Sequence, residues 1–128
     1  MQGGYVIRNH LASISCDAAE HAGLPALATA CAEVTEYMLG AEVDDRLAGS
    51  YAYTNMMAVA TAGWLMSKQL RAAHAEMANG DTSAFLRTRV AACRYYLNVM
   101  VPEALVFKVS AMAGAELLYA VDAAELAA

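Results

Sequence analysis

The side chains that could perform chemistry are few in this 128-residue chain, and they lie far apart in the sequence. The three histidines, His10, His21 and His74, are isolated from one another, which favours surface or capping roles over catalysis. The three cysteines form no Cys-x-x-Cys pair, so they indicate neither a zinc knuckle nor a redox dithiol. Each falls on or near an apolar helical row, where a buried, reduced thiol packs as a small hydrophobe. These cysteines are Cys16, Cys31 and Cys93.

Carboxylates are the next candidates for chemistry. Asp17, Glu20 and His21 share one face of the first predicted helix, and Glu33 shares a face of the second with Glu36. Bundle proteins that hold two metals use inward carboxylates with Glu-x-x-His pairs, which this chain lacks, so solvated faces are the better interpretation. The Gly-Gly pair near the amino end lacks the context of a phosphate loop, and no nucleophile elbow is present. The sequence predicts no catalytic, cofactor-binding or metal-binding residue.

The composition limits the remaining function classes. The chain is 59% hydrophobic and only 16% charged, and its mean hydropathy is +0.36. Ordinary soluble domains are roughly 25% charged, so we expect part of this surface to be covered. A net charge of −5 without a basic stripe argues against nucleic-acid binding. The uncharged segment Leu47–Ser67 is long enough to cross a bilayer but too polar for lipid, and no signal peptide is evident, so the cytoplasm is the expected location.

Apolar residues at helical spacing then define the elements. One row runs from Met56 to Met77 and a second from Leu86 to Leu118. The break between them, Asn79-Gly80-Asp81, offers a carboxyl cap and an amino cap, which predicts a tight helix hairpin. No stretch alternates as a strand does. We therefore expect an all-α fold, an antiparallel helical bundle of four main helices with a short helical turn before helix three, in a single domain over residues 1–128.

Caps and helix breakers predict the element boundaries. The first helix is expected over residues 4–21, closed by Gly23 in the left-handed conformation. Pro25 suits the first turn of the second helix, which fades near Gly40. The remaining predicted boundaries are Asp44 and Asp45 at the short helical turn, Gly49-Ser50 as the cap of the third helix, Ala78 as its end, and Asp81 as the cap of the fourth.

The fourth predicted helix has two unusual features. Pro102 cannot donate a hydrogen bond to the carbonyl of Asn98, so we expect a kink there, with the Asn98 side chain as a local partner for freed groups. A second apolar row also lies opposite the core row. A helix that is apolar on both sides is normally buried on both, so its back should meet the carboxyl tail, a second copy or a neighbouring domain. The residues of this predicted interface are Tyr95, Val99, Pro102, Val106 and Val109.

The third predicted helix carries a second apolar row beside its main one, formed by Tyr53, Met57, Ala60 and Trp64. Packing in the core is the simpler interpretation of this row. Because pockets between helices are common sites for apolar ligands, a ligand-contacting wall of Tyr53, Met57 and Trp64 is the alternative. That alternative describes a free-standing bundle that binds a small hydrophobic ligand or acts as a dimerisation module.

The same helix provides a resemblance to a known family. It contains, at Tyr53–Leu70, the segment YTNMMAVATAGWLMSKQL, which resembles a helix of the acetyl-CoA dehydrogenase-like C-terminal domain. That domain is a helical extension found in a subset of acyl-CoA dehydrogenases. Asn79–Ala104 is similar to the family's helix hairpin, and with Ala113-Gly114 the resemblance covers about residues 24–114. The matching hairpin residues are Gly80-Asp81, Phe85, Arg94-Tyr95 and Pro102.

The resemblance implies a non-catalytic module of an FAD-dependent acyl-CoA dehydrogenase, an enzyme that oxidises an acyl-CoA thioester to its 2-enoyl form. In such enzymes the catalytic carboxylate and the flavin site belong to earlier domains, whose Gly-Thr-rich stretch is missing here. The resemblance therefore implies no cofactor in this chain and FAD in the parent enzyme. The module would contribute packing, subunit contacts or the shape of the CoA-side entrance. Its implied partners are the preceding dehydrogenase domains and a second subunit, without nucleic acid or membrane insertion.

Overall fold

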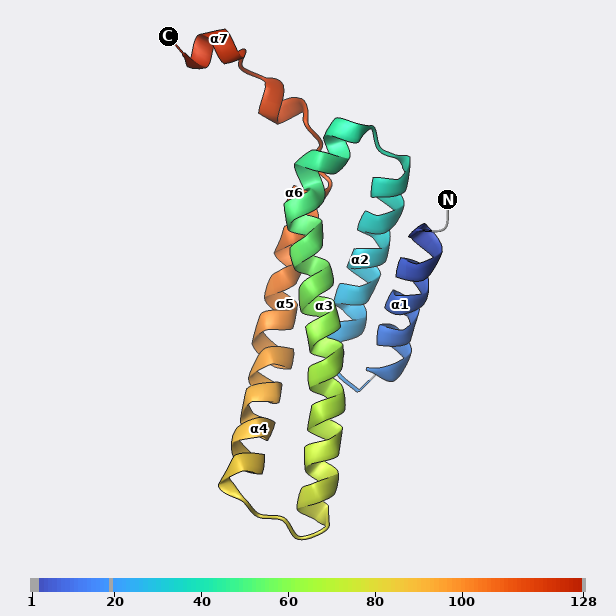
Figure 1. Cartoon of the computed structure of the whole chain (residues 1–128), viewed down its shortest axis with the longest axis vertical. Coiled ribbons are helices and arrows are strands. Elements are labelled where there is room, and N and C mark those ends of the chain that lie inside the picture. Colours follow the sequence, from blue (N-terminus) through green and yellow to red (C-terminus); the bar gives the residue numbers. More distant parts are fainter. Residues whose placement is uncertain (1–2, 19, 128) are drawn as a thin grey trace.

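The computed structural model describes residues 3–18 and 20–127, which form helices and connecting turns without any strand (Figure 1). This confirms the all-α class. The longest helix, α3 (Val43–Ala78), lies at the centre. Helices α2 (Gly23–Gly40) and α1 (Gly3–Asp17) lie on one side of it, and α4 (Ala84–Tyr95) lies on the other. The lower ends of α3 and α4 extend past α1 and α2 as a two-helix hairpin.

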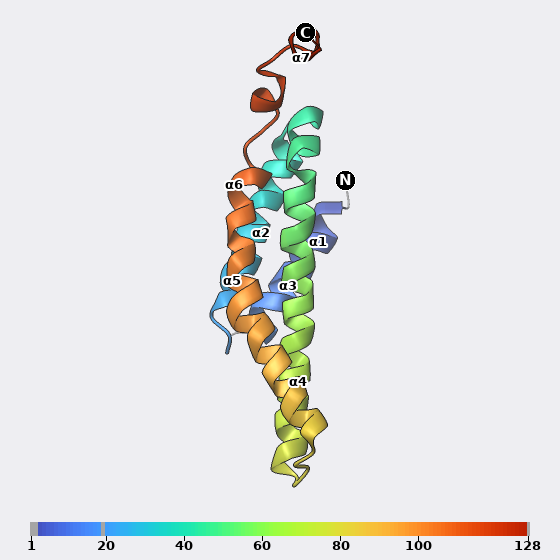
Figure 2. The ribbon, with the colours of Figure 1, turned by 90° about the vertical axis from the view of Figure 1, so that its left-hand side faces the viewer.

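The fourth predicted helix is an unbroken helical stretch whose hydrogen-bonding pattern changes four times along its length. The whole stretch runs beside α3 (Figure 2), and we call it the α4–α6 stretch. It ends at Ala111, so the predicted continuation of its apolar row to Leu118 is wrong. After α4 it consists of the π-helical η1 (Tyr96–Met100), α5 (Val101–Glu103), the 3-10 helix η2 (Ala104–Val106) and α6 (Phe107–Ala111).

The chain after α6 leads away from the other helices. It contains a 3-10 helix, η3 (Glu116–Tyr119), and one further turn of helix, α7 (Ala123–Leu126). Both lie beyond the ends of the other helices in Figures 1 and 2. Leu118 is exposed there. We call residues 112–127 the tail.

The core lies where α1, α2, α3 and the α4–α6 stretch pack together. Both predicted apolar rows contribute to it, through Met56 and Leu70 on α3 and through Leu86 and Leu97 on the opposite side. Met77 is exposed because it lies near the end of the hairpin, past the other helices. The largest fully buried side chains are Ile14, Leu24, Leu27, Val34, Met56, Leu86, Val101, Cys31, Cys93 and Ser67.

The connection between α1 and α2 differs from the prediction. Helix α1 ends at Asp17 rather than at residue 21, and Gly23 begins α2 instead of closing α1. Two backbone hydrogen bonds, from His21 N–H to Ala18 O and from Leu24 N–H to His21 O, carry the chain from one helix to the next. Gly23 therefore needs no left-handed backbone. Pro25 lies in the first turn of α2, and the helix ends at Gly40, as predicted.

Helix α3 is a single helix from Val43 onwards, so the predicted separate turn before it and the predicted cap at Gly49-Ser50 are wrong. Asp44 and Asp45 lie in its first turn, where the negative charge of acidic side chains interacts favourably with the positive end of the helix dipole. Gly49 is buried inside the helix instead, and a Cβ atom there would collide with the carbonyl oxygen of Ala111. None of the helices in the described ranges is both long enough and apolar enough to cross a membrane.

The turn between α3 and α4 follows the prediction in part. Helix α3 ends at Ala78 with Asn79 as its cap, and Gly80 has a positive φ of 102°. Helix α4, however, is capped by Ser83, whose side chain accepts a hydrogen bond from the N–H of Leu86 at 3.3 Å. The predicted cap, Asp81, accepts from Ser83 N–H at 2.8 Å and so stabilises the turn rather than the helix.

Candidate functional site

The π-helical segment η1 lies where a kink was predicted, just before Pro102. The N–H of Val101 donates to the carbonyl of Tyr96, five residues earlier, and Pro102 has no N–H to offer. The wider turn therefore accommodates the missing donor within a continuous helical stretch. Such π turns occur frequently at functional sites. Asn98, expected to bond freed backbone groups, lies in this segment and lines a pocket.

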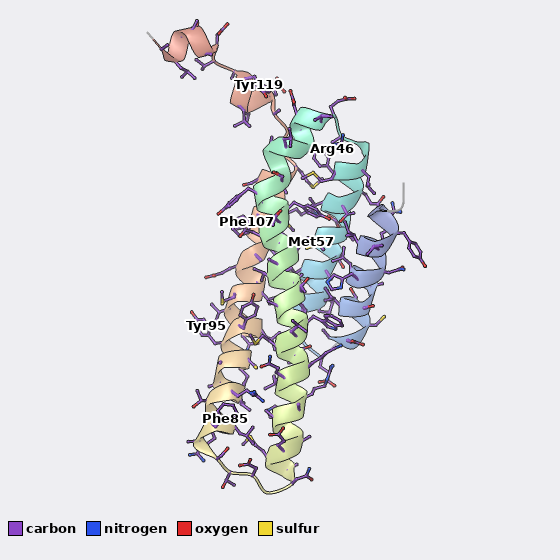
Figure 3. All side chains as sticks on the ribbon, in the orientation of Figure 1. Arg46, Met57, Phe85, Tyr95, Phe107 and Tyr119 are labelled. Carbon is purple, nitrogen blue, oxygen red and sulfur yellow. The ribbon has the colours of Figure 1, made fainter. Side chains whose placement is uncertain are left out.

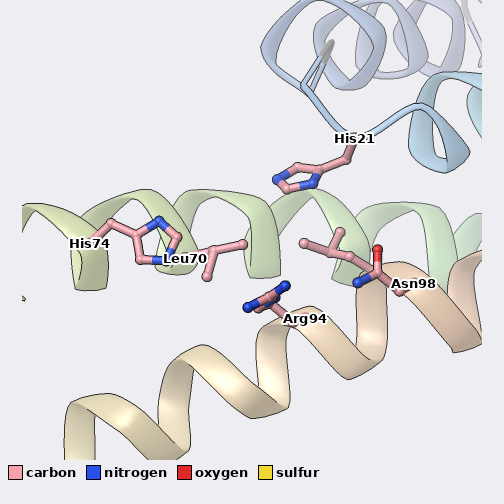
Figure 4. A pocket seen from close by; sticks show the side chains of 6 residues that line it. His21, Leu70, His74, Arg94 and Asn98 are labelled. Carbon is pink, nitrogen blue, oxygen red and sulfur yellow. The ribbon is translucent and has the colours of Figure 1, made fainter.

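This pocket has a volume of about 440 Å³ and lies between three parts of the chain (Figure 4). The connection between α1 and α2 covers one side, α3 forms the second, and α4 with η1 forms the third. Two pairs spaced four residues apart place their side chains on the same helix face. The lining residues are His21, the pair Leu70 and His74, the pair Arg94 and Asn98, and Leu97.

The pocket is lined by several hydrogen-bond donors and by no acidic side chain. Leu70 and Leu97 are buried, whereas the polar side chains are partly or fully exposed. None of the lining residues is a carboxylate. In Figure 4 the guanidinium of Arg94 points from α4 into the space below His21. Arg94 takes part in none of the ion pairs formed among residues 3–18 and 20–127.

Sequence reasoning did not find this pocket. Its cationic and imidazole side chains come from three segments that are far apart in the chain, so surface or capping roles were expected for His21 and His74. The four-residue spacings of Leu70 with His74 and of Arg94 with Asn98 were the available signal. Only the packing of the α1–α2 connection over the hairpin brings His21 to them.

The five predicted interface residues lie on the outside of the α4–α6 stretch. Tyr95 is 62% exposed, Val106 70% and Val109 78%, and Pro102 is exposed while Val99 is partly buried. Figure 3 shows Tyr95 at the outer edge of the molecule. The tail leads away from this outer face, so residues 112–127 do not cover it (Figure 1). The other two predicted occupants, a second copy and a neighbouring domain, stay predictions.

The alternative ligand wall makes contacts within the chain. The hydroxyl of Tyr53 is 2.8 Å from Oγ1 of Thr35, and the indole N–H of Trp64 donates to Oδ2 of Asp17 at 3.0 Å. Met57 is partly buried against the core. These contacts are those of packed side chains, and neither the pocket above nor a second, smaller hollow between α1 and α2 is lined by them. A ligand-binding role for this row stays a prediction.

The predicted grouping of Asp17, Glu20 and His21 on one helix face is wrong, because α1 ends at Asp17. Among the residues that the structure describes, no three His, Cys, Asp or Glu side chains are placed to hold a metal ion together. His10 is partly buried. Its ring packs edge-on against Trp64, with centroids 5.5 Å apart, and lies 2.9 Å from the Thr61 hydroxyl.

The three cysteines are free thiols in different environments. Cys31 and Cys93 are buried, as predicted for small apolar side chains. Burial raises the pKa of the Cys31 thiol to about 12 and also raises the pKa of Cys93, so both thiols are poor nucleophiles. Cys16 is exposed, contrary to the prediction, because it lies two residues after Ile14 and so off the buried face of α1.

Comparison with known proteins gives one match. The family model described as acetyl-CoA dehydrogenase C-terminal like matches residues 8–122. The matched region begins in α1 and ends in the tail, so it includes the outer face of the α4–α6 stretch and the pocket beside η1. No curated protein and no solved structure matches the chain.

Proposed function

Because the chain belongs to the acetyl-CoA dehydrogenase C-terminal-like family, we propose that it is the non-catalytic C-terminal domain of a larger, FAD-dependent acyl-CoA dehydrogenase. In this proposal residues 1–128 form one domain, in which α1, α2, α3 and the α4–α6 stretch act as an antiparallel four-helix bundle. The parent enzyme oxidises an acyl-CoA thioester, and this domain packs against its flavin-binding domains. The domain supplies an interface rather than a reacting group.

One observation carries the proposed role in packing, the exposed apolar outer face of the α4–α6 stretch. Tyr95, Val106 and Val109 all lie on it, and each exposes most of its side chain. Soluble monomers rarely expose a large contiguous apolar patch, and such patches mark interaction sites. The low charged fraction of 16% points the same way, since a freely soluble surface is normally richer in charge.

The residues of this chain do not fit the flavin itself. The pocket beside η1 holds about 440 Å³, and the hollow between α1 and α2 about 250 Å³. Neither is lined by a glycine-rich loop whose backbone N–H groups could hold a pyrophosphate. We therefore assign FAD to other domains of the proposed parent enzyme, and no step of its reaction to residues of this chain.

The outer face can be tested with charged substitutions and matched controls. Tyr95→Asp and Val106→Asp each place a carboxylate in the proposed interface. Tyr5→Asp and Val6→Asp change the same residue types on α1, at similar exposures of 68% and 67%, on the opposite side of the molecule. Binding to separately purified flavin-binding domains of an acyl-CoA dehydrogenase from the same source, and self-association, are measured by light scattering. Circular dichroism gives the helical content.

We expect the two outer-face variants to weaken association at least about tenfold, because burying an unpaired carboxylate is costly. The two α1 variants should associate like the unaltered chain, and all four should keep its helical content. Unchanged association in both outer-face variants would reject this face as the interface. The mass of the native product in its source cell tests the parent enzyme directly, because a product of only 128 residues would contradict a C-terminal domain.

A further inference from the structure

We propose that the pocket between α3, α4 with η1, and the α1–α2 connection binds a small organic phosphate, with Arg94 as the main phosphate ligand. This inference does not rest on the proposed function, because the pocket and the outer face are formed by different residues. Three features of the pocket carry it. They are its charge, its size with an apolar floor, and its construction on packed helices.

The first feature is a local excess of donors in an acidic protein. The chain has a net charge of −5, yet the pocket is lined by a guanidinium, two imidazoles and an amide, with no carboxylate. Arg94 is in none of the described ion pairs, and no Asp or Glu occurs between Thr82 and Val101. Its charge is therefore not neutralised by its own helix. A guanidinium matches the oxygens of a phosphate with two parallel hydrogen bonds.

The second feature is size. A volume of about 440 Å³ falls within the range of roughly 300–1,000 Å³ that is typical of small-molecule sites. This is more room than an inorganic phosphate ion alone would fill. Leu70 and Leu97 give the pocket an apolar floor, on which an organic group can rest while its phosphate faces Arg94. The pocket therefore fits a phosphate ester with a compact organic part, such as a nucleotide, better than a simple anion.

The third feature is that packed elements hold the polar groups. Arg94 and Asn98 are one turn apart, at the point where α4 passes into η1. Buried Leu97 and Cys93 fix this part of the stretch against α3, where the Cys93 sulfur lies 3.8 Å from that of Met66. The backbone that carries these side chains is therefore already fixed before a ligand binds, so binding has only the side chains to order.

The test is a titration of the full chain with ADP, followed by isothermal calorimetry and by the ring resonances of His21 and His74. We expect saturable binding of ADP that shifts both ring signals, and clearly weaker binding of adenosine, which lacks the phosphates. Arg94→Gln should weaken ADP binding at least about tenfold, because it removes a charge-assisted pair of hydrogen bonds. The matched control is Arg89→Gln, since the Arg89 guanidinium lies 4.9 Å from the Phe85 ring centre and lines no part of the pocket.

Arg89→Gln changes the net charge equally and should bind ADP like the unaltered chain. Equal weakening in both arginine variants would overturn the assignment to Arg94 and indicate only non-specific attraction. Equal binding of adenosine and ADP would overturn the phosphate assignment. No binding of ADP up to about 10 mM would overturn the site, because a millimolar dissociation constant would be visible there. Circular dichroism of each variant confirms that the helices are intact.

Discussion

Helix α1 and the α4–α6 stretch lie on opposite sides of α3, and they are attached to the molecule by different kinds of contact. Helix α1 buries a short apolar face, and polar contacts at the margins of this face also attach the helix to α2 and α3. Arg8 pairs with Glu36 on α2 at 2.6 Å. Asp17 accepts a hydrogen bond from Trp64, lies 3.5 Å from Lys68, and offers its backbone carbonyl to Arg71 at 2.6 Å.

The α4–α6 stretch is held mainly by apolar burial. Leu97, Val101 and Ala111 are buried against α2 and α3. At its upper end the backbone of α6 approaches α3 so closely that only a glycine fits at position 49. An ion pair between Lys108 and Glu33 accompanies this packing. Just after the stretch, the N–H of Ala115 in the tail donates to Oδ1 of Asp45 at 2.8 Å.

This difference between polar contacts and apolar burial predicts which part of the molecule contributes most to stability. Ion pairs between exposed side chains contribute about 0–1 kcal/mol each and are weakened by salt. Removal of a buried leucine costs several times as much. We therefore expect the stability of the whole fold to depend on the α4–α6 stretch, and the attachment of α1 to respond to solution conditions. Three experiments test this contrast.

The largest effect is expected from Leu97→Ala. Leu97 is buried, so its truncation should lower the free energy of unfolding by about 3 kcal/mol through lost burial and a new cavity. Leu105→Ala, at a partly exposed position on the same stretch, should cost less than about 1 kcal/mol. Urea denaturation followed by circular dichroism measures both values. Equal losses at the two positions would show that the packing of this stretch does not dominate stability.

A smaller loss, about 1–3 kcal/mol in the same urea experiment, is expected from Gly49→Ala, because the new methyl group must push the backbone of α6 away from α3. At Gly63 a Cβ atom would meet only side-chain ends, 2.9 Å from Cγ2 of Val101 and 3.0 Å from Cδ1 of Leu24, so Gly63→Ala should cost less. Gly40→Ala has open space and serves as the control. If Gly49→Ala were as stable as Gly40→Ala, the close approach would be unnecessary.

The smallest effect concerns α1 in acid. The hydrogen bond from Trp64, with the nearby charge of Lys68, lowers the pKa of Asp17, and Arg8 lowers that of Glu36 in the same way. Since both folded pKa values lie below the unfolded ones, this stabilisation is complete above the unfolded values. It is lost as the pH falls below about 4, through the folded values. We expect a change in Trp64 fluorescence there while overall helical content persists.

Asp17→Asn is the matched variant for the acid experiment, because it keeps an oxygen acceptor for Trp64 but cannot titrate. The fluorescence change below about pH 4 should shrink in this variant. An identical change in Asp17→Asn and the unaltered chain would show that Asp17 does not couple α1 to the acid response. Loss of all helical signal at the same pH would instead contradict a local effect on α1.

The sequence predicted those parts of the fold that depend on local periodicity and turn chemistry. The central parts of the apolar rows, around Met56 and Leu97, are buried, although Met77, Met100 and Leu118 of the same rows are exposed. Asn79-Gly80 ends α3 as predicted, because a glycine with positive φ acts within a few residues. The role of Gly49 could not be found in this way. Its neighbour is a backbone oxygen more than sixty residues later, so a glycine inside a helix was interpreted as a cap.

The candidate functional residues show the same contrast between features that depend on nearby residues and features that depend on distant ones. The outer row of Tyr95 to Val109 follows from spacing along one helical stretch, and its exposure in the structure is consistent with a surface that a partner covers. The pocket forms because His21, in the connection between α1 and α2, lies close to Arg94 on α4. The prediction extended the first helix to residue 21 and so placed His21 on a helix face. Because the end of the first helix was predicted four residues too late, at residue 21 instead of Asp17, the pocket was not predicted.

The π turn at Tyr96–Met100 also affects how this protein can change in length. In a regular α-helix, insertion or deletion of one residue rotates everything downstream by about 100°, because each turn holds 3.6 residues. A π turn already contains the equivalent of one inserted residue and absorbs it locally. The π turn lies between Arg94 on α4 and Ala111, the residue of α6 that approaches Gly49. An insertion of one residue that formed this π turn would therefore have left the orientations of α4 and α6 unchanged.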